Sequence, residues 1–252
     1  MRILLTNDDG IHAPGLKVLE AIARTLSDDI TIVAPELEQS GQSRAMTLTQ
    51  PLRLRTLEPG VHAVSGTPSD CVLLAMRELM EGEPDLLLSG VNKGQNLAED
   101  TSYSGTVAAA MFGMQHNIPS VALSQTQNFR GRGSCPWETA EAWGPRALKP
   151  VLAHGWPDDA VMNINFPDLD PGDVKGIKVT RQGFRDEQIL RTEKREDLRG
   201  NHYYWVGYGG KLSDPEEGTD LRAIYDGYVS ITPLHVDLTH DPFLEKMQAW
   251  QV

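Results

Sequence analysis

The sequence predicts an α/β protein with a Rossmann-like, mostly parallel sheet, helices on both faces, and a C-terminal β-hairpin and extension region. Short apolar runs alternate with helical patterns through the first half of the 252 residues, and this alternation is typical of a parallel sheet covered by helices. After about residue 125 the runs become shorter and a strongly charged stretch appears. We therefore expect one domain over residues 1–252. Its parallel core, at about 1–125, carries the site, and hairpin and C-terminal segments occupy about 170–252.

In the first half, apolar runs bounded by turn residues predict buried strands, and helical spacing predicts the connections between them. The predicted strands cover residues 2–5, 30–34, 61–65, 85–89 and 120–124. The predicted helices begin after Pro14, at Thr67-Pro68 and at residues 103–106. At the second of these starts, Thr67, Pro68 and Asp70 have the order of an N-cap, a first-turn proline and a capping-box acid.

The second half predicts a different organisation. Residues 137–154 have helical composition, but Gly144-Pro145 interrupts them, so we expect a kink or two shorter helices, because proline removes a backbone donor. The charged stretch 185–201 favours a hairpin over another βαβ unit. The remaining predictions are a loop at 128–133, strands at 161–166, 176–180, 203–206 and 229–231, a turn at 214–218 and a short helix at 220–225.

Composition limits the function classes. The formal net charge of −12 argues against a surface for a nucleic-acid duplex. It still permits a small phosphorylated substrate, provided that a metal ion or a helix N-terminus supplies local positive potential. Cys71 and Cys135 are the two cysteines and form no zinc or disulfide pattern. No secretory signal or membrane-length apolar run is recognisable, so we expect a cytoplasmic location and no membrane partner.

Polar residues follow three of the predicted strands. Asp8 and Asp9 come after the first strand, Ser40 after the second, and Asn92 after residues 85–89. Since ligands bind at the carboxyl ends of the strands in open α/β sheets, we expect these side chains to meet. Carboxylate, hydroxyl and amide oxygens suit Mg²⁺, Mn²⁺ or Ca²⁺ better than zinc. The alternative for Asp8-Asp9-Gly10 is an ordinary strand-to-helix turn.

Ser104, Gly105 and Thr106 stand at a predicted helix start, where free N–H groups and the helix dipole favour a phosphate. Gly105 would let the anion approach closely. The alternative is that Ser104 or Thr106 only caps the helix. Asn96 could donate to a phosphate oxygen, although an asparagine in a loop is also ordinary turn chemistry. P-loop, dinucleotide-binding and nucleophile-elbow motifs are missing from the sequence.

Motifs along the whole chain resemble those of the SurE family, the stationary-phase survival proteins that are metal-dependent nucleotidases. The resemblance implies that Asp8, Asp9, Ser40 and Asn92 bind one divalent metal ion per subunit, Mg²⁺ or Mn²⁺. It also implies that Asn96 and residues 104–106 lie in the phosphate pocket. Many members have histidine or asparagine followed by serine where this chain has Arg44-Ala45, so the resemblance implies no functional role for those two residues. The matching motifs are MRILLTNDDG, AP…SGQS, GTPSDCV, SGVNKGQN, YSGTVAAA, NINFP and TDLRAIYDGYVSITPL.

The expected function is that of a metal-dependent phosphomonoesterase, with Asp8, Asp9 and Asn96 as catalytic residues. The resemblance implies nucleoside 5′- and 3′-monophosphates as substrates, with short-chain polyphosphate as a further one. The alternative is a metal-dependent nucleotide sensor without turnover. A receiver domain is disfavoured, because Ser89 and Gly90 stand where its acceptor aspartate would follow the strand. Residues 185–201 are too polar to pack on their own core, and the resemblance implies a homodimer or homotetramer with exchanged segments.

Overall fold

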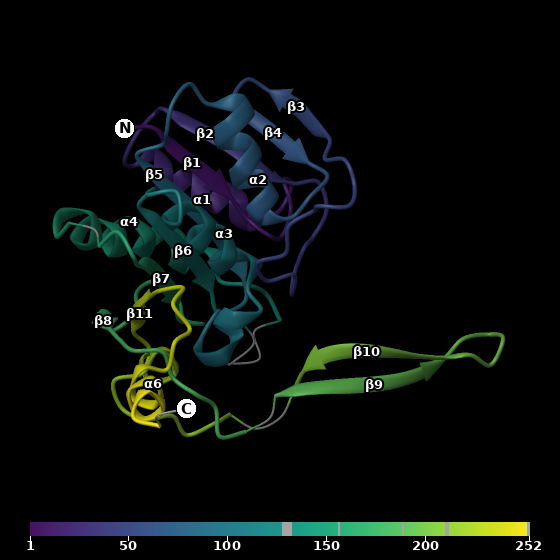
Figure 1. The fold of residues 1–252 in the computed structure, drawn as a ribbon, viewed down its shortest axis with the longest axis vertical. Coiled ribbons are helices and arrows are strands. Elements are labelled where there is room, and N and C mark those ends of the chain that lie inside the picture. The colour runs from purple at the N-terminus through teal and green to yellow at the C-terminus, as the bar shows by residue number, and fades with distance from the viewer. Residues whose placement is uncertain (128–132, 156, 188, 210–211, 251–252) are drawn as a thin grey trace.

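The computed structural model describes residues 1–127, 133–155, 157–187, 189–209 and 212–250. The predicted loop at 128–133 therefore lies outside the described residues, apart from Gly133. Among the described residues, nine strands form one sheet and two form a separate ribbon (Figure 1). The order of strands across the sheet is β3 (Leu54–Glu58), β4 (Val61–Val64), β2 (Ile30–Pro35), β1 (Ile3–Thr6), β5 (Leu86–Lys93), β6 (Ser120–Gln125), β7 (Val161–Phe166), β11 (Val229–Leu234) and β8 (Ile177–Val179).

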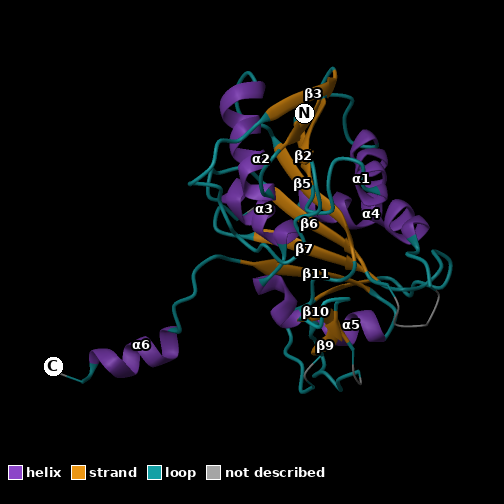
Figure 2. Ribbon diagram, turned by 90° about the vertical axis from the view of Figure 1, so that its right-hand side faces the viewer, coloured by secondary structure: helices purple, strands orange, loops and turns teal. Residues whose placement is uncertain are grey.

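The sheet is parallel from β4 through β7, with β3 and β11 antiparallel to their neighbours β4 and β7. Helices α1 (Pro14–Arg24) and α4 (Trp137–Ala153) cover one face, and α2 (Pro68–Leu74) and α3 (Gly105–Met114) cover the other (Figure 2). Side chains of a strand alternate between faces, so Ile3 and Leu5 pack with the α1 side and Leu4 with the α2 side. The predicted α/β class is confirmed.

The helices on these faces confirm one predicted detail and correct another. The capping box of α2 is confirmed, because Thr67 accepts from the Asp70 N–H while the Asp70 carboxylate accepts from the Thr67 N–H. The expected alternative of two shorter helices in 137–154 is wrong, because α4 is one helix with Pro145 and Pro150 inside it, whereas the alternative of a kink at Gly144-Pro145 stays a prediction. Packing explains its continuity: a Cβ on Gly144 would lie 2.5 Å from Ile22 Cδ1, so α4 and α1 are in direct contact there.

Two strands, β5 and β11, continue three or more residues past their predicted ends. β5 continues past Ser89 to Lys93, with an irregularity in its ladder to β6 between Ser89 and Asn92, so Asn92 lies on a strand rather than in a loop. β11 runs through Pro233 to Leu234, although we expected it to end at Thr232-Pro233. Its pairing with β8 stops at Ile231 while its pairing with β7 continues. A proline is tolerated there, because its missing N–H removes no bond on the open side.

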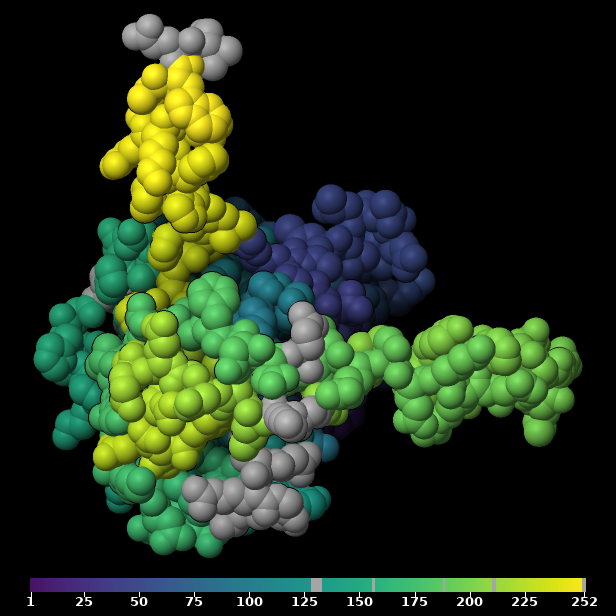
Figure 3. Space-filling view, turned by 90° about the horizontal axis from the view of Figure 1, so that it is seen from below, coloured from purple at the N-terminus to yellow at the C-terminus, as the bar shows by residue number. Residues whose placement is uncertain are grey.

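The C-terminal region departs from the core. β9 (Leu190–Glu196) and β10 (His202–Tyr208) form an antiparallel ribbon, hereafter the arm, which confirms the predicted hairpin. The arm projects from the body on one side and α6 (Asp241–Gln248) on another (Figure 3). α5 (Asp220–Tyr225) precedes β11, while η1 (Ala75–Leu79) and η2 (Ala98–Ser102) are short π and 3₁₀ turns. Within the described ranges, no helix is long and apolar enough to cross a membrane.

Candidate metal and phosphate site

The turn after β1 brings two carboxylates to the carboxyl edge of the sheet. Asn7 Nδ2 donates to the Gly10 carbonyl at 2.9 Å, and the Gly10 N–H donates back to Asn7 Oδ1 at 3.2 Å. Gly10 has a φ of +100°, a conformation that glycine adopts without steric cost. The chain thus leaves the pleat directly after the strand, and Asp8 and Asp9 are no longer forced to opposite faces.

Asp8 is packed directly against the start of α3. Its side chain is 3% exposed, and its Oδ1 accepts from Thr106 Oγ1 at 2.6 Å. A Cβ on Gly105 would lie 2.8 Å from Asp8 Cβ, so only glycine leaves room for this carboxylate. Burial raises the pKa of Asp8 to about 6, against the lowering effect of the Thr106 hydrogen bond and with a further raising effect of the Asp9 charge.

Asp9 is the second carboxylate of the turn. Its Oδ2 accepts from the backbone N–H of Lys93 at 3.0 Å, which joins the turn after β1 to the end of β5. Burial raises the pKa of Asp9, and the nearby Glu38 charge raises it further. Two neighbouring acids with raised pKa values would both be stabilised in their ionised form by a cation.

Ser40 and Asn92 complete the expected set of metal ligands. The Gln39 N–H donates to the Asp8 carbonyl at 2.7 Å, which holds the loop after β2 beside the acidic turn. Asn92 Nδ2 donates to the Gly94 carbonyl at 2.9 Å and so leaves the amide oxygen as the group for a cation. Ser40 Oγ donates to Glu38 Oε1 at 2.9 Å, so a carboxylate that was not among the predicted site residues lies beside this hydroxyl.

One cavity of about 450 Å³ unites most of these side chains. Asp8, Ser40 and Asn92 line it together with Asn96 and Ser104. Asp9 lies on an adjoining cavity of about 360 Å³, which also has Ser40 and Lys93 in its lining. In the part of the chain that the structure describes, no cluster of three or more His, Cys, Asp or Glu side chains could hold a metal. The oxygen donors present fit Mg²⁺ or Mn²⁺, which accept one or two carboxylates and otherwise bind water and substrate.

Asn96 is held from three sides. Its Nδ2 donates to Ser124 Oγ at 2.8 Å and, more weakly, to Thr106 Oγ1 at 3.4 Å. Its backbone N–H donates to Asn165 Oδ1, and its carbonyl accepts from both Asn163 Nδ2 and Asn165 Nδ2. Asn163 and Asn165 were not among the predicted site residues, although the NINFP motif that contains them was a visible signal. Asn96 is therefore a rigid part of the cavity wall rather than a loop residue that must be ordered by a ligand.

The side chains at the start of α3 cap the helix and bind the Asp8 carboxylate. Ser104 is the N-cap, and its Oγ accepts from the Val107 N–H at 3.0 Å, so the capping alternative holds for this residue. Its hydroxyl also lines the cavity and can donate to a phosphate oxygen. Thr106 is fully buried and its hydroxyl donates to Asp8. Phosphate binding by Gly105 and Thr106 stays a prediction, and both residues contact the Asp8 carboxylate in the structure.

Comparison with known proteins identifies the family of this chain. A family model described as Survival protein SurE matches residues 3–188. The chain belongs to the SurE family. A protein named 5′-nucleotidase SurE from Hyphomonas neptunium is 69% identical over 252 residues, which is 100% of both chains. A SurE relative of the same name from Caulobacter vibrioides is 60% identical over 96% of this chain and 92% of its own. The crystal structure of the SurE protein from Aquifex aeolicus matches with a TM-score of 0.84 at 39% identity, covering 100% of both chains.

Proposed function

We propose that this chain is a divalent-metal-dependent phosphomonoesterase that hydrolyses nucleoside monophosphates to nucleoside and phosphate. The observation that carries the proposal is the convergence of Asp8, Ser40 and Asn92 from three neighbouring parallel strands on one cavity that also contains Asn96 and Ser104. Relatives over the full chain are named 5′-nucleotidase SurE, which supports the same reaction class.

The side chains of the site divide into those that would hold the metal ion and those that would contact the phosphate. Asp8, Asp9, Ser40 and Asn92 would hold one Mg²⁺ or Mn²⁺ ion, which when bound supplies positive charge to the phosphate. The Ser104 hydroxyl donates to a phosphate oxygen, and Asn96 fixes the wall on which the phosphate rests. Either Asp8 or Asp9 would also orient the attacking water or accept its proton. Water then forms the new P–O bond as the ester P–O bond breaks.

The substrate range is the finer part of the proposal. The names of the relatives specify 5′-nucleotides, and we extend the proposal to 3′-monophosphates and, as a weaker activity, to short-chain polyphosphate. We also propose that the enzyme acts in the cytoplasm as a homodimer or homotetramer. In this assembly residues 1–125 form the catalytic core and residues 170–252 supply the segments that subunits exchange.

The test is phosphate release from adenosine 5′-monophosphate after chelation and metal replacement. We expect chelated protein to be inactive, Mg²⁺ or Mn²⁺ to restore turnover, and zinc to substitute poorly, because the donor set lacks nitrogen and sulfur. Full turnover in excess chelator would refute the metal site. Tight nucleotide binding without turnover under any metal would instead identify a sensor.

A further inference from the structure

Glu38 lies in the loop after β2 and lines both cavities of the site. Asp8 lines the cavity of about 450 Å³, and Asp9 lines the adjoining cavity of about 360 Å³. Glu38 and Ser40 belong to the wall that the two cavities share. A third carboxylate is thus placed between the two aspartates that are expected to bind the metal.

The backbone that carries Glu38 is fixed to the acidic turn. The Ile11 N–H donates to the Pro35 carbonyl at 2.8 Å, and the Gln39 N–H donates to the Asp8 carbonyl at 2.7 Å. These bonds lie on both sides of Glu38 in the sequence. Glu38 therefore has a defined position beside the turn after β1, although it belongs to a loop.

The hydroxyl proton of Ser40 is engaged by Glu38. Ser40 Oγ donates to Glu38 Oε1 at 2.9 Å. A hydroxyl has one proton and two lone pairs, so the Ser40 oxygen retains only its capacity to accept. A cation requires lone pairs, whereas a phosphate oxygen requires a donor. The contact with Glu38 consequently prepares Ser40 to bind a metal ion and not a phosphate group.

Glu38 also adds negative charge to the site. Burial raises the pKa of Asp9 most, and the Glu38 charge raises it further, so the two carboxylates are close enough to interact. A cation bound beside Asp9 is attracted by both charges. Because Glu38 is exposed to solvent, salt should screen its share of this attraction.

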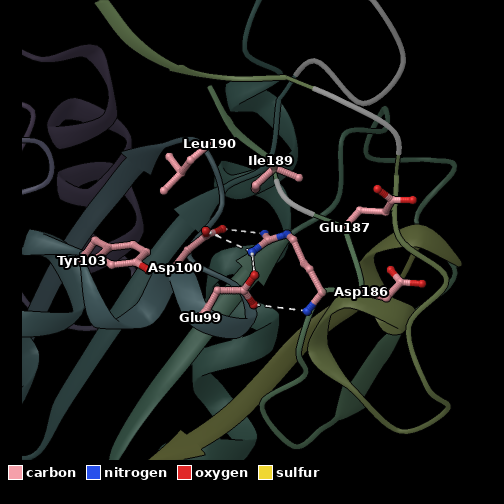
Figure 4. A pocket seen from close by; sticks show the side chains of 8 residues that line it. Glu99, Asp100, Tyr103, Asp186, Glu187, Ile189 and Leu190 are labelled. Carbon is pink, nitrogen blue, oxygen red and sulfur yellow. Dashed lines mark hydrogen bonds and ion pairs between the residues drawn. The ribbon is translucent and has the colours of Figure 1, made fainter. Parts of the chain in front are cut away.

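Another group of carboxylates, in the cavity of about 150 Å³ shown in Figure 4, has a different arrangement. Arg185 is paired there with Asp100 at 2.6 Å and with Glu99 at 3.4 Å. The guanidinium supplies the positive charge beside these acids, and the pairs hold η2 against the segment that leads into the arm. Glu38, in contrast, is hydrogen-bonded to a residue that a metal ion itself would contact.

We propose that Glu38 is a positioning residue of the metal site, which orients the Ser40 oxygen toward the cation and strengthens metal binding through its charge. The inference rests on the proposed function, because it takes the cation to lie on the expected set of ligands. Groups that orient a metal ligand from behind contribute about 10–100-fold to metal affinity. Orientation and charge are separable, since a glutamine at position 38 can accept the Ser40 hydrogen bond but carries no charge.

The experiment measures Mn²⁺ binding to the full chain by isothermal titration calorimetry, after chelation and removal of the chelator and without substrate. The variants are Glu38→Ala, Glu38→Gln, Ser40→Ala and the double variant Glu38→Ala/Ser40→Ala, each checked for its fold by circular dichroism. Glu36→Ala is the matched control, since Glu36 lies on the same loop and is paired with Arg55 at 3.3 Å.

Glu38→Ala should weaken Mn²⁺ binding about 10–100-fold. Glu38→Gln should weaken it by at most about fivefold, the scale of an exposed charge pair. This smaller loss should disappear in about 1 M potassium chloride, where the screening length is about 3 Å. In the Ser40→Ala background, removal of Glu38 should cost no more than Glu38→Gln does in wild type, because no hydroxyl remains to be oriented. Glu36→Ala should bind Mn²⁺ as wild type does.

A Glu38→Ala variant that binds Mn²⁺ within about threefold of wild type would overturn the inference. An equal loss with and without the Ser40 hydroxyl would overturn it as well. Both results leave the phosphomonoesterase proposal intact if wild type binds Mn²⁺ and releases phosphate from adenosine 5′-monophosphate. If wild type binds Mn²⁺ without turnover, the proposed reaction fails and the binding data still decide the role of Glu38. If wild type binds no Mn²⁺, the metal site and the role of Glu38 fail together.

Discussion

Strands β1 and β10 are both rich in apolar side chains, yet their surroundings are opposite. Every residue of β1 is buried, between α1 on one face and α2 and α3 on the other. Every residue of β10 is exposed, including Tyr204, Trp205 and Val206. The core completes its own packing, whereas the arm does not. An isolated two-stranded ribbon is only marginally stable in water, so the arm is the part of the chain that the proposed assembly would stabilise.

The arm also has two unlike faces. Cross-strand pairing puts Leu190 opposite Tyr208, Thr192 opposite Val206 and Lys194 opposite Tyr204. Because paired residues point to the same side, the part of this face nearest the body is largely apolar and aromatic, while Glu196 and His202 lie on it near the tip. The contrast with β1 supports the proposed division, in which the catalytic core is organised within one chain and the arm makes contact between chains. Four predictions, in order of decreasing effect, test this division.

Removing one charge from the acidic turn should abolish most activity and leave the fold intact. Asp9→Asn preserves the shape of the side chain and removes a negative charge that faces the expected cation. We expect at least a 100-fold loss in kcat/KM for adenosine 5′-monophosphate, since even groups behind the metal ligands contribute about 10–100-fold. Circular dichroism checks the fold. Activity within about threefold of wild type would contradict the metal role of Asp9.

Gly105 and Gly207 offer a matched pair of substitutions, one in the core and one in the arm. A Cβ on Gly105 would lie 2.8 Å from Asp8 Cβ, whereas a Cβ on Gly207 would meet no atom within 4 Å. Gly105→Ala should lower the unfolding free energy by about 1–3 kcal/mol and reduce turnover by displacing Asp8. Denaturant unfolding and kinetics measure both effects. If Gly207→Ala is as harmful as Gly105→Ala, the contrast between core and arm is wrong.

The metal-free core should become less stable as pH rises. Folding raises the pKa of the Asp8 carboxyl from 3.8 to about 6, so the native state binds more protons than the unfolded state between these values. The unfolding free energy therefore falls as pH increases through this window, by on the order of 3 kcal/mol from Asp8 alone. Asp9, Asp100 and Asp220 also have raised pKa values and add the same sign.

We expect the Tm of chelated protein to rise when pH is lowered from about 7 to about 4.5, and added Mg²⁺ to reduce this dependence by favouring ionised Asp8. Asp8→Asn is the control, because it removes the titrating group. Identical pH slopes of Tm for chelated wild type and Asp8→Asn would show that Asp8 is not responsible.

Changes on the apolar face of the arm should affect assembly and leave the core almost untouched. We expect wild type to be at least a dimer by light scattering at micromolar concentration. Val206→Asp should shift the population toward monomer with little change in the circular dichroism of the body. Glu193→Gln, on the opposite face beside Trp205, is the control and should keep the wild-type mass. A monomeric wild-type protein would refute the proposed exchange of segments.

The core was predictable from sequence because its signals are local. Apolar runs marked β1, β2 and β6, and the Thr67–Asp70 capping box marked the start of α2. β3 was missed because all five of its residues are exposed and show no buried alternation. α6 was missed because a short helix with no buried residue leaves no core-facing stripe to recognise. Continuity of α4 through Pro145 depends on its contact with α1, which local rules do not contain.

The site was predictable from the sequence to a similar extent as the core. Family motifs and strand ends pointed to Asp8, Ser40 and Asn92, and the structure brings them to one cavity. The contact of Gly105 with Asp8 was not foreseen, because we expected this glycine to face the substrate. Tyr208 was also missed, since it reaches the cavity only through the path of the arm. Such contacts join distant segments and leave no spacing pattern in the sequence.

Asn163 and Asn165 make three hydrogen bonds with the backbone of Asn96, and these bonds order the Asn96 segment during folding rather than on ligand binding. The strand β7 holds the segment between β5 and α3 in place before any substrate arrives. The entropy lost in fixing this segment therefore belongs to folding, and association with a ligand does not incur it again. The amide proton of Asn96 should accordingly exchange with deuterated solvent as slowly as those of the central strands, in the free enzyme as well as with a nucleotide bound.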